Sequence, residues 1–346
     1  MVGHHVSLNG GPSFDAREGQ TILDAALRAN RWIPHNCSQG TCGTCRFKVL
    51  EGTVDHGDST EELLPQADRT DGFALACQAS PVTDLLGALL GESAITTPRH
   101  RLRDITGTVV VRDVVARETI RLVIDLDEPL DFDAGQYVEL RIPNSPLRRA
   151  YSIASPPSQE SSIELHIRLT PGGLATERWV FASLAVGERV AMQGPLGTFS
   201  MIEPEDGPVV LVAGGTGLAP LKAILLHAVE QGLASEIHLY HGGRREEDLY
   251  DGDVFQGLAG SGVRYVPVLS EQTWDGACGM VTDAVESDFA SCRGMSAYIC
   301  GPPPMVSAAV RTFKRRRMRP AQIFREEFTP APLPPGVVGV GAPASS

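Results

Sequence analysis

Hydrophobic and polar positions change their spacing along the chain, and the changes divide the sequence into three predicted regions. In residues 1–93, HHVSLNGGPSFDA predicts a hairpin with Asn-Gly-Gly at its turn. TILDAALRAN has the apolar spacing of an amphipathic helix capped near Gln20 and Thr21, and RFKVLEGTVD predicts a strand. Residues 1–93 are therefore predicted to form a small mixed α/β domain.

The second region alternates apolar and polar residues between Gly, Pro and Asp signals. Its segments are TGTVVVRDVV, TIRLVIDL, QYVELRI, SIELHIRL and ERVAMQGPLGTF, and RRAYSIAS lies among them. This pattern predicts an antiparallel six-stranded β-barrel domain at residues 104–206. A polar connector at residues 94–103 precedes it and is expected to be a linker.

From Gly207 the pattern changes to apolar strands alternating with helical segments. The strands are PVVLVAG, EIHLYHG, VRYVPVL and SAYICGP, and QIFREEF adds a last one. Such alternation predicts an α/β domain at residues 207–330, with a parallel sheet covered by helices on both faces. Residues 331–346 are rich in Pro, Gly and Ala, a composition that favours disorder.

Four cysteines carry the strongest chemical signal. Three of them are spaced C-x4-C-x2-C, and the fourth follows 32 positions later. This is the plant-type spacing for a 2Fe-2S cluster, and Gly40 and Gly43 allow the loop to turn sharply around it. A zinc ribbon would need a second C-x2-C or histidines, and an odd total of seven cysteines disfavours a disulfide framework. The predicted metal ligands are Cys37, Cys42, Cys45 and Cys77.

Composition and charge restrict the class of protein. The 346 residues are 42% hydrophobic and 21% charged, as in ordinary globular proteins. An apolar run of ~18 residues and a basic-then-apolar leader are both missing, so we expect a cytoplasmic protein that neither spans a membrane nor is secreted. The net charge of -12 argues against nucleic acid as a partner. Residues 1–93 hold 12 acidic and 6 basic side chains, which fits an acidic electron carrier and ordinary solubility alike.

The barrel region carries a short motif that resembles the ferredoxin-NADP reductase superfamily. Arg149, Tyr151 and Ser152 match its R-x-Y-S motif. The resemblance implies that the arginine meets the flavin pyrophosphate, that the tyrosine packs on the isoalloxazine ring, and that the serine hydrogen-bonds near the reactive N5. A guanidinium suits phosphate and an aromatic ring suits a planar cofactor. Read alone, a Tyr-Ser pair is also common in plain sheet.

A second flavin signal is PGGLAT, which is followed by the predicted helix ERWVFASLA. Gly172, Gly173 and Thr176 match the family's G-G-x-x-[ST] loop, and N–H groups at the start of a helix suit a pyrophosphate. FAD is therefore expected rather than FMN. His166 and Arg168, one strand earlier, lie where the family contacts the flavin phosphate or ribityl chain, although His166 equally fits a strand histidine without a ligand.

The α/β region carries the nucleotide motifs of the same superfamily. AGGTGLAP matches its G-G-T-G-x-A-P turn and is neither G-x-G-x-x-G nor a P-loop. In YICGPPPM, the resemblance places Cys300 beside the nicotinamide ring as a small packing residue. Phe328 is the candidate aromatic residue over the flavin. The residues expected at the nucleotide are Gly214, Gly215, Thr216, Gly217, Pro220, Arg244, Cys300, Gly301 and Pro302.

The stretch GRREEDLYD bears on coenzyme choice. Arg244 and Arg245 suit a 2′-phosphate, whereas Glu246, Glu247 and Asp248 would repel it. We expect NADH to be preferred and NADPH to be accepted more weakly.

Residues 1–328 as a whole resemble the reductase component of bacterial multicomponent aromatic-ring oxygenases: a β-grasp ferredoxin domain, a flavin barrel and a nicotinamide domain. NADH gives two electrons as hydride and the cluster takes one at a time, so the flavin must stand between them. The resemblance implies that Ser152, Thr216 and Cys300 place the reacting atoms, and that no acid-base pair is needed.

The resemblance also implies the partners. It predicts a monomer that reduces a ferredoxin, a terminal oxygenase of a ring-hydroxylating dioxygenase or monooxygenase system, or both. Two alternatives stay open. The same electron chain could serve another acceptor, such as a deoxysugar dehydrase, or the cluster could act as a redox sensor, which would normally require an output domain.

Overall fold

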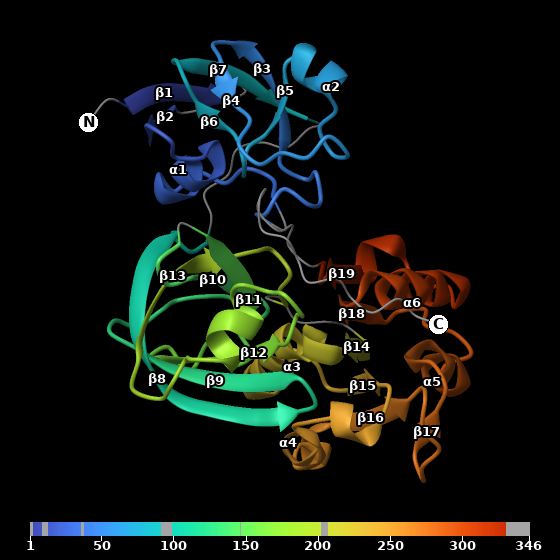
Figure 1. Cartoon of the computed structure of the whole chain (residues 1–346). Coiled ribbons are helices and arrows are strands. Elements are labelled where there is room, and N and C mark those ends of the chain that lie inside the picture. Colours follow the sequence, from blue (N-terminus) through green and yellow to red (C-terminus); the bar gives the residue numbers. More distant parts are fainter. Residues whose placement is uncertain are drawn as a thin grey trace. The chain divides into compact units, whose positions relative to one another are not determined.

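The computed structural model describes residues 3–8, 13–35, 38–90, 99–145, 147–201 and 207–329 (Figure 1). The chain forms two compact units. The first comprises residues 1–104 with Gly194–Gly197, and the second comprises the remainder. Residues 94–98 of the predicted linker and the whole of the predicted tail, residues 331–346, lie outside the described residues.

The first unit is built on a five-stranded mixed sheet of order β2-β1-β7-β3-β5. Its strands are β1 (Gly3–Leu8), β2 (Phe14–Arg17), β3 (Arg46–Glu51), β5 (Phe73–Leu75) and β7 (Leu85–Leu89), and β4 (Val54–Asp55) pairs separately with β6 (Ser80–Pro81). The antiparallel pairing of β1 with β2 confirms the predicted hairpin, whose turn at residues 9–12 is outside the described residues.

Two helices complete the described part of this unit, α1 (Ile22–Arg28) and α2 (Gln66–Thr70). Thr21 is the N-cap of α1, as predicted, and its hydroxyl accepts a hydrogen bond from the Asp24 N–H at 3.2 Å. The apolar side of α1 is buried, including Ile22 and Leu23. The packing of α1 and α2 with a mixed sheet confirms the predicted β-grasp class.

The second unit begins with a six-stranded antiparallel sheet of order β11-β10-β13-β8-β9-β12. A bridge between Ile153 and Leu165 joins its two ends and closes the barrel. Alternate side chains, among them Leu122, Leu140 and Ile163, fill the interior. Its strands are β8 (Arg103–Ala116), β9 (Thr119–Leu126), β10 (Tyr137–Arg141), β11 (Arg148–Ser152), β12 (Ser162–Arg168) and β13 (Arg189–Leu196). The predicted barrel is confirmed.

The rest of this unit is a parallel sheet of order β17-β16-β15-β14-β18-β19. Its strands are β14 (Val209–Gly214), β15 (Ile237–Gly243), β16 (Val263–Leu269), β17 (Ala277–Cys278), β18 (Ser296–Gly301) and β19 (Ile323–Glu327), and its α-helices are α3 (Leu218–Gln231), α4 (Gly252–Gln256), α5 (Val281–Asp288) and α6 (Pro303–Arg315). Short helical turns are η1 (Thr176–Phe181), η2 (Gly215–Gly217), η3 (Glu246–Asp248), η4 (Ala259–Ser261) and η5 (Pro320–Gln322).

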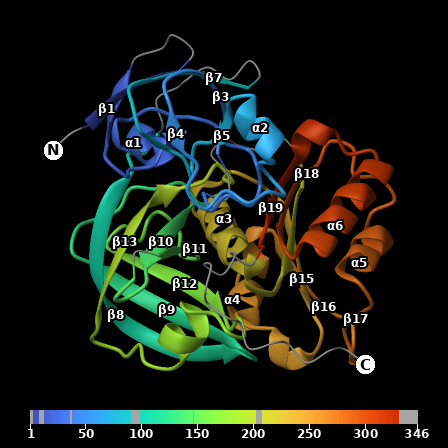
Figure 2. The same ribbon diagram turned by 45° about the horizontal axis from the view of Figure 1, so that its top comes forward.

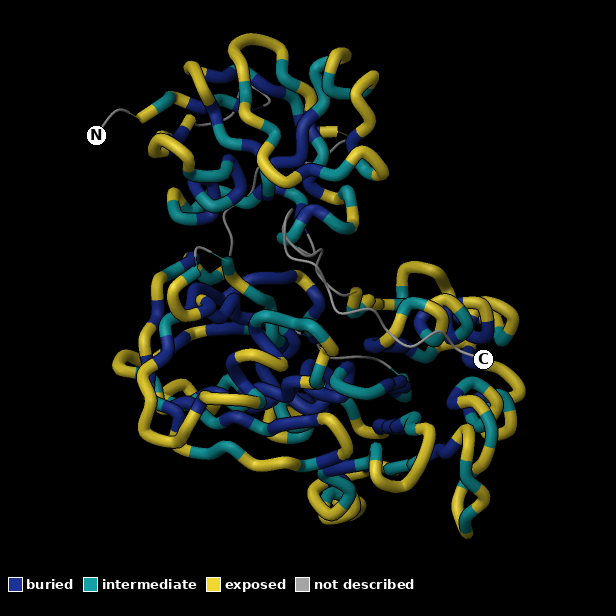
Figure 3. Tube along the Cα trace, in the orientation of Figure 1, coloured by how far each residue is buried: buried dark blue, intermediate teal, exposed yellow. Residues whose placement is uncertain are grey.

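Both faces of the parallel sheet are covered, as predicted. One apolar cluster joins β14 and β15 to α3 and α4, and another joins the opposite face to α5 and α6. Figure 2 shows α5 and α6 together on one side of the sheet and α3 on the other. Every residue of β14 and β18 is buried, so these two strands form the centre of the domain (Figure 3). Among the described residues, no helix combines the length and the apolar character needed to span a membrane.

Candidate cofactor and nucleotide sites

Three of the four predicted cluster ligands belong to the described residues, and Cys37 lies outside them. The Cys45 and Cys77 sulfur atoms are buried and 3.2 Å apart, well beyond the roughly 2 Å of a disulfide bond. Cys42 lies on the more exposed side of the same loop. These thiols, without a histidine among the predicted ligands, are the donors that a 2Fe-2S cluster requires.

The local fold explains why the thiols converge. β3 begins directly after Cys45 and pairs with β5, which ends two residues before Cys77. The first N–H groups of α1 donate to the carbonyl oxygens of Ala76 and Ala79, which fixes the segment that carries Cys77. Gly40 and Gly43 both have φ of +74°, so the predicted sharp turns are present.

The R-x-Y-S residues lie on β11, which pairs with β10 so that Ser152 faces Tyr137 and Tyr151 faces Val138. Ser152 is buried, and burial raises the pKa of the Tyr151 hydroxyl above its usual value. The Arg149 guanidinium donates to the Arg148 carbonyl oxygen at 2.8 Å.

The Gly-Gly loop is closed by its own threonines. Thr176 Oγ1 accepts from the Thr170 N–H and donates to the Thr170 carbonyl oxygen, both at 3.1 Å. A Cβ on Gly173 would meet this hydroxyl, so only glycine fits there. The Gly172 N–H donates to a Glu177 carboxylate oxygen at 2.7 Å, which shows that this N–H can hold an anion. The Gly173 N–H donates to the Thr170 carbonyl oxygen at 2.9 Å, so the Gly172 N–H is the donor of this pair that already meets an anionic group.

The element after this loop differs from the regular helix that the sequence predicts. Residues 176–181 form a single π-helical stretch, η1, in which the Val180 N–H bonds to the carbonyl oxygen of Ala175, five residues earlier. So short an element adds little dipole field. Phosphate binding at this loop would therefore depend on individual N–H groups and not on the dipole of a helix terminus.

The two predicted nucleotide segments meet at the centre of the parallel sheet. β14 and β18 are neighbours, and Ala213 pairs with Cys300. Consequently the Gly214–Gly217 turn abuts Gly301. A Cβ on Gly217 would clash with the Cys300 carbonyl group, and one on Gly214 would clash with the Met305 sulfur. Thr216 is half-buried and Pro220 is buried in the first turn of α3. The glycines of the motif are therefore explained by close backbone approach.

A residue that the sequence reasoning missed lies beside this turn. Glu326 of β19 pairs with Cys300 of β18, is only 8% exposed, and has a carboxylate oxygen, Oε2, with no hydrogen-bond partner in the described chain. Burial raises the pKa of Glu326 to about 8, and burial together with Glu326 raises the pKa of the Cys300 thiol. One signal existed: side chains alternate along a strand, so one of two successive glutamates, Glu326 and Glu327, must point inward.

Phe328 follows β19, and its N–H donates to the Gly301 carbonyl oxygen at 2.9 Å. Its ring is partly buried against the cluster that contains Cys300. The structure thus brings Phe328 to the predicted nucleotide segment. Its stacking on a flavin stays a prediction.

In the loop after β15, most of the acidic side chains that were expected to repel a 2′-phosphate are paired with other groups. Arg244 is exposed, and Asp248 Oδ2 accepts the N–H groups of Arg244 and Arg245, both at 3.0 Å. Arg117, from the barrel, pairs with Asp248 at 3.0 Å and with Glu247 at 3.4 Å. Two of the three carboxylates predicted to repel a 2′-phosphate are therefore paired with a cation.

The flavin and nucleotide motifs adjoin within the second unit. Arg168 follows His166 on β12, and its guanidinium is 3.2 Å from the position that a Cβ on Gly215 would occupy. Gly215 has φ of +56°, which also favours glycine. A cofactor along β11 and β12 would therefore lie next to a nucleotide at the Gly214–Gly217 turn.

Comparison with known proteins identifies the three domains. Residues 6–82 match the 2Fe-2S iron-sulfur cluster binding domain, residues 106–201 the oxidoreductase FAD-binding domain, and residues 211–311 the oxidoreductase NAD-binding domain. This combination defines an iron-sulfur flavoprotein oxidoreductase that uses a nicotinamide coenzyme.

Relatives of known activity match along almost the whole chain. The chain is 48% identical to the reductase subunit of an aromatic O-demethylase from Amycolatopsis sp., covering 93% of this chain and 98% of the relative. It is 37% identical to the phenol 2-monooxygenase reductase component DmpP of Pseudomonas sp., covering 92% of each. A crystal structure of the Amycolatopsis cytochrome P450 reductase GcoB superposes with a TM-score of 0.89 at 47% identity, covering 95% of this chain and 100% of that one.

The chain therefore belongs to the family of electron-transfer reductase components of oxygenase systems.

Proposed function

We propose that this reductase prefers NADH and delivers its electrons to an oxygenase that acts on aromatic compounds, with a cytochrome P450 of the O-demethylase kind as the first candidate acceptor. The 48% identity to the aromatic O-demethylase reductase subunit and the likeness to the Amycolatopsis cytochrome P450 reductase GcoB, both over nearly the full length, support this acceptor. The proposed path of electrons from the coenzyme to the flavin is supported by one observation. The Gly214–Gly217 turn meets Cys300 and Gly301 at one point of the sheet, and Arg168 of the flavin barrel lies beside this turn.

The residues have distinct proposed tasks. Bound FAD would accept hydride from NADH and release single electrons. The Tyr151 ring and the buried Ser152 hydroxyl would hold the flavin on β11, while Arg149 and the Gly172 N–H would bind its pyrophosphate. His166 belongs to a buried polar network and hydrogen-bonds to Glu164 and Tyr250, so a direct flavin contact by His166 is not part of this proposal.

On the nucleotide side, the turn and the start of α6 would contact the coenzyme. Thr216 is the polar side chain of the turn, and Cys300 and Pro302 line the end of β18. The Cys300 thiol is buried and burial raises its pKa, so it stays protonated and acts by packing and not as a nucleophile. The four cysteines Cys37, Cys42, Cys45 and Cys77 would hold the cluster.

Metal and flavin analysis together with one variant tests the order of centres. Purified protein is expected to contain two irons, two sulfides and one FAD per chain by the definition of the cofactors. Cys42→Ser is expected to abolish reduction of cytochrome c and to leave NADH-driven ferricyanide reduction largely intact, because ferricyanide collects electrons at the flavin. Zinc in place of iron, or equal loss of both activities, would contradict this part of the proposal.

Reconstitution tests the acceptor. The reductase is mixed with NADH and either a cytochrome P450 O-demethylase or a phenol hydroxylase terminal component, and product formed per NADH consumed is measured. Tight coupling with the P450 component supports the proposal, and coupling with the phenol component alone would favour the second candidate, which the 37% identity to DmpP supports. The relatives named above give no support to a deoxysugar dehydrase acceptor or to a sensor.

A cytoplasmic location and a monomeric state, expected from the sequence, belong to the same proposal. Size-exclusion chromatography with light scattering is expected to give the mass of one chain, and a stable dimer would contradict the monomer.

A further inference from the structure

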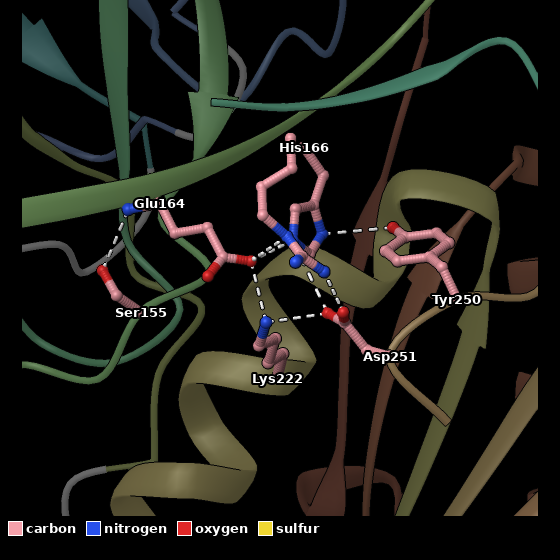
Figure 4. A network of polar contacts seen from close by, with 7 residues as sticks. Ser155, Glu164, His166, Lys222, Tyr250 and Asp251 are labelled. Atoms are coloured by element: carbon pink, nitrogen blue, oxygen red, sulfur yellow. Dashed lines mark hydrogen bonds and ion pairs between the residues drawn. The ribbon is translucent and has the colours of Figure 1, made fainter. Parts of the chain in front are cut away.

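A largely buried set of charged and polar side chains connects the flavin barrel to the nucleotide domain within the second unit. We call this set the Lys222 network. Its members are Arg121, Glu164, His166, Lys222, Tyr250 and Asp251. Lys222 is only 5% exposed, and its ammonium group donates to Glu164 Oε1 and to Asp251 Oδ2, both at 2.7 Å (Figure 4). Arg121 pairs with the same two carboxylates.

The network is balanced in charge. Burial by itself would raise the pKa of Glu164, but the hydrogen bond from His166 and the charge of Lys222 lower it to about 2. Two carboxylates therefore face two cations. Burial lowers the pKa of His166, so its ring is neutral: Nε2–H donates to Glu164 at 2.6 Å and Nδ1 accepts from the Tyr250 hydroxyl at 3.1 Å.

The same geometry explains why a metal ion is not needed here. The side-chain ligand atoms of Glu164, His166 and Asp251 lie within 4.8 Å of one another, a spacing that could hold a cation. The Lys222 ammonium and the Arg121 guanidinium already supply the positive charge at that point. The network is thus complete without an added ligand, and its role must follow from what it connects.

Its members come from both domains of the unit. Arg121 lies on β9, and Glu164 and His166 lie on β12, all in the barrel. Lys222 lies on α3, and Asp251 directly precedes α4, both in the nucleotide domain. Figure 4 shows the Lys222 side chain rising from its helix between the Glu164 and Asp251 carboxylates.

On the flavin side, the network is joined to the R-x-Y-S segment. The Glu164 N–H donates to Ser155 Oγ at 3.1 Å, and the Glu164 carbonyl oxygen accepts from the Ala154 N–H at 2.8 Å. Both partners follow Ser152 by two or three residues. The position of Glu164 is therefore tied to that of the strand on which the flavin is proposed to lie.

On the nucleotide side, the network holds the start of α3. Lys222 is in the second turn after the Gly214–Gly217 motif, which leads directly into that helix. Asp251 has φ of +60°, a conformation that non-glycine residues seldom adopt, and its carboxylate is paired with the Lys222 ammonium group. The helix that carries the nucleotide turn is thus anchored to β12 by buried charges.

We propose that Lys222 and Asp251 are positioning residues, which hold the nucleotide turn at the distance from the flavin strand that hydride transfer requires. This inference rests on the proposed function. Lys222 lies outside the cofactor motifs. Asp251 ends the GRREEDLYD stretch, but its carboxylate pairs with Lys222 and Arg121 inside the network. Each residue therefore acts through the elements it joins. Rates of transfer between bound groups depend steeply on geometry, and a displacement of about 1 Å can cost roughly 100-fold.

The test uses the full chain loaded with its flavin and cluster. In anaerobic stopped-flow mixing with NADH, Lys222→Met is expected to reduce flavin at a rate lower by about tenfold or more, with an NADH Kd within about twofold of the wild-type value, because the binding motifs are intact. A flavin beside a nicotinamide gives a long-wavelength charge-transfer absorbance, which can be measured with NADH analogues that cannot be oxidised. In Lys222→Met this absorbance is expected to be weaker than in the wild type. Lys222→Arg, which keeps the charge, should restore part of both signals.

Asp251→Asn provides a second variant in case Lys222→Met is recovered without flavin. It removes one charge and keeps the shape and the Lys222 to Glu164 contact, and we expect a loss of several-fold in the same rate. Arg189→Met is the matched control, because Arg189 and Asp127 form an exposed ion pair within the barrel alone. This variant is expected to reduce flavin at the wild-type rate.

The outcomes separate this inference from the proposed function. If wild-type protein does not oxidise NADH, the proposed function fails. If wild-type protein does so and flavin-loaded Lys222→Met and Asp251→Asn match it in rate and charge-transfer absorbance, the inference is overturned, even where their melting temperatures fall.

Discussion

Glu326 gives the sharpest prediction about stability, because it is a carboxyl group buried without a charged partner among the described residues. Burial raises its pKa from 4.5 to about 8, so the folded protein keeps it protonated near neutral pH, whereas the unfolded chain ionises it above about pH 4.5. Between these two values the folded state binds one more proton than the unfolded state. The free energy of unfolding must therefore fall as the pH rises from about 4.5 to 8 and level off above that.

The size of the effect follows from the width of this window. Each pH unit within it lowers the free energy of unfolding by about 1.4 kcal/mol, so the full window amounts to about 5 kcal/mol as an upper limit. Glu326→Gln replaces the carboxyl group by a neutral amide of the same size and removes this dependence. We expect the variant to match the wild type near pH 5 and to exceed it by several kcal/mol near pH 8.

Thermal unfolding measured every half unit from pH 5 to 8.5 checks the prediction. The relevant quantity is the difference in melting temperature between variant and wild type, since other titrating groups contribute equally to both. Glu327→Gln is the control, because Glu327 is the exposed neighbour on the same strand. A difference that stays constant with pH, or an equal effect of the control variant, would refute the assignment of a raised pKa to Glu326.

Three further predictions concern the cofactor sites. Acid release of the flavin followed by chromatography is expected to give FAD, and FMN would instead assign Gly173 and Thr176 to a single phosphate. The kcat/KM for NADH is expected to exceed that for NADPH, and a preference for NADPH that disappears in Arg244→Ala would reverse this assignment. Gly217→Ala is expected to destabilise the protein by about 1–3 kcal/mol and to raise the KM for NADH, since a Cβ would clash with the Cys300 carbonyl group; an unchanged melting temperature would show that the turn can move aside.

Much of the fold was predictable because each region has a strong local period. β14 is apolar at nearly every position, as expected of a central parallel strand, and β9 alternates as expected of a barrel strand. The π-helical form of η1 was not predictable. In a π-helix each N–H bonds to the carbonyl group five residues earlier, whereas in an α-helix it bonds four residues earlier. Over a single turn this difference leaves no distinct pattern of apolar and polar residues in the sequence.

The stretches that carry the cofactor predictions could be recognised for a related reason: each is short and continuous, and its glycines have a local cause. Lys222 is different. Its partners Glu164 and Asp251 are 58 and 29 positions away, so their pairing depends on how strands and helices assemble. The one local signal was a lone cation on the apolar first half of α3, where a charge must find a buried partner or reach water.

The strand order explains why the nucleotide residues meet where they do. From β14 the chain proceeds to β15, β16 and β17 on one side, then returns to place β18 and β19 on the other. Ligands bind to such sheets at the carboxyl ends of the strands, at the point where the order reverses. That point lies between β14 and β18, where the Gly214–Gly217 turn abuts Cys300 and Gly301. α3 starts from this same point, so the Lys222 network ties to β12 the helix that begins at the proposed nicotinamide site.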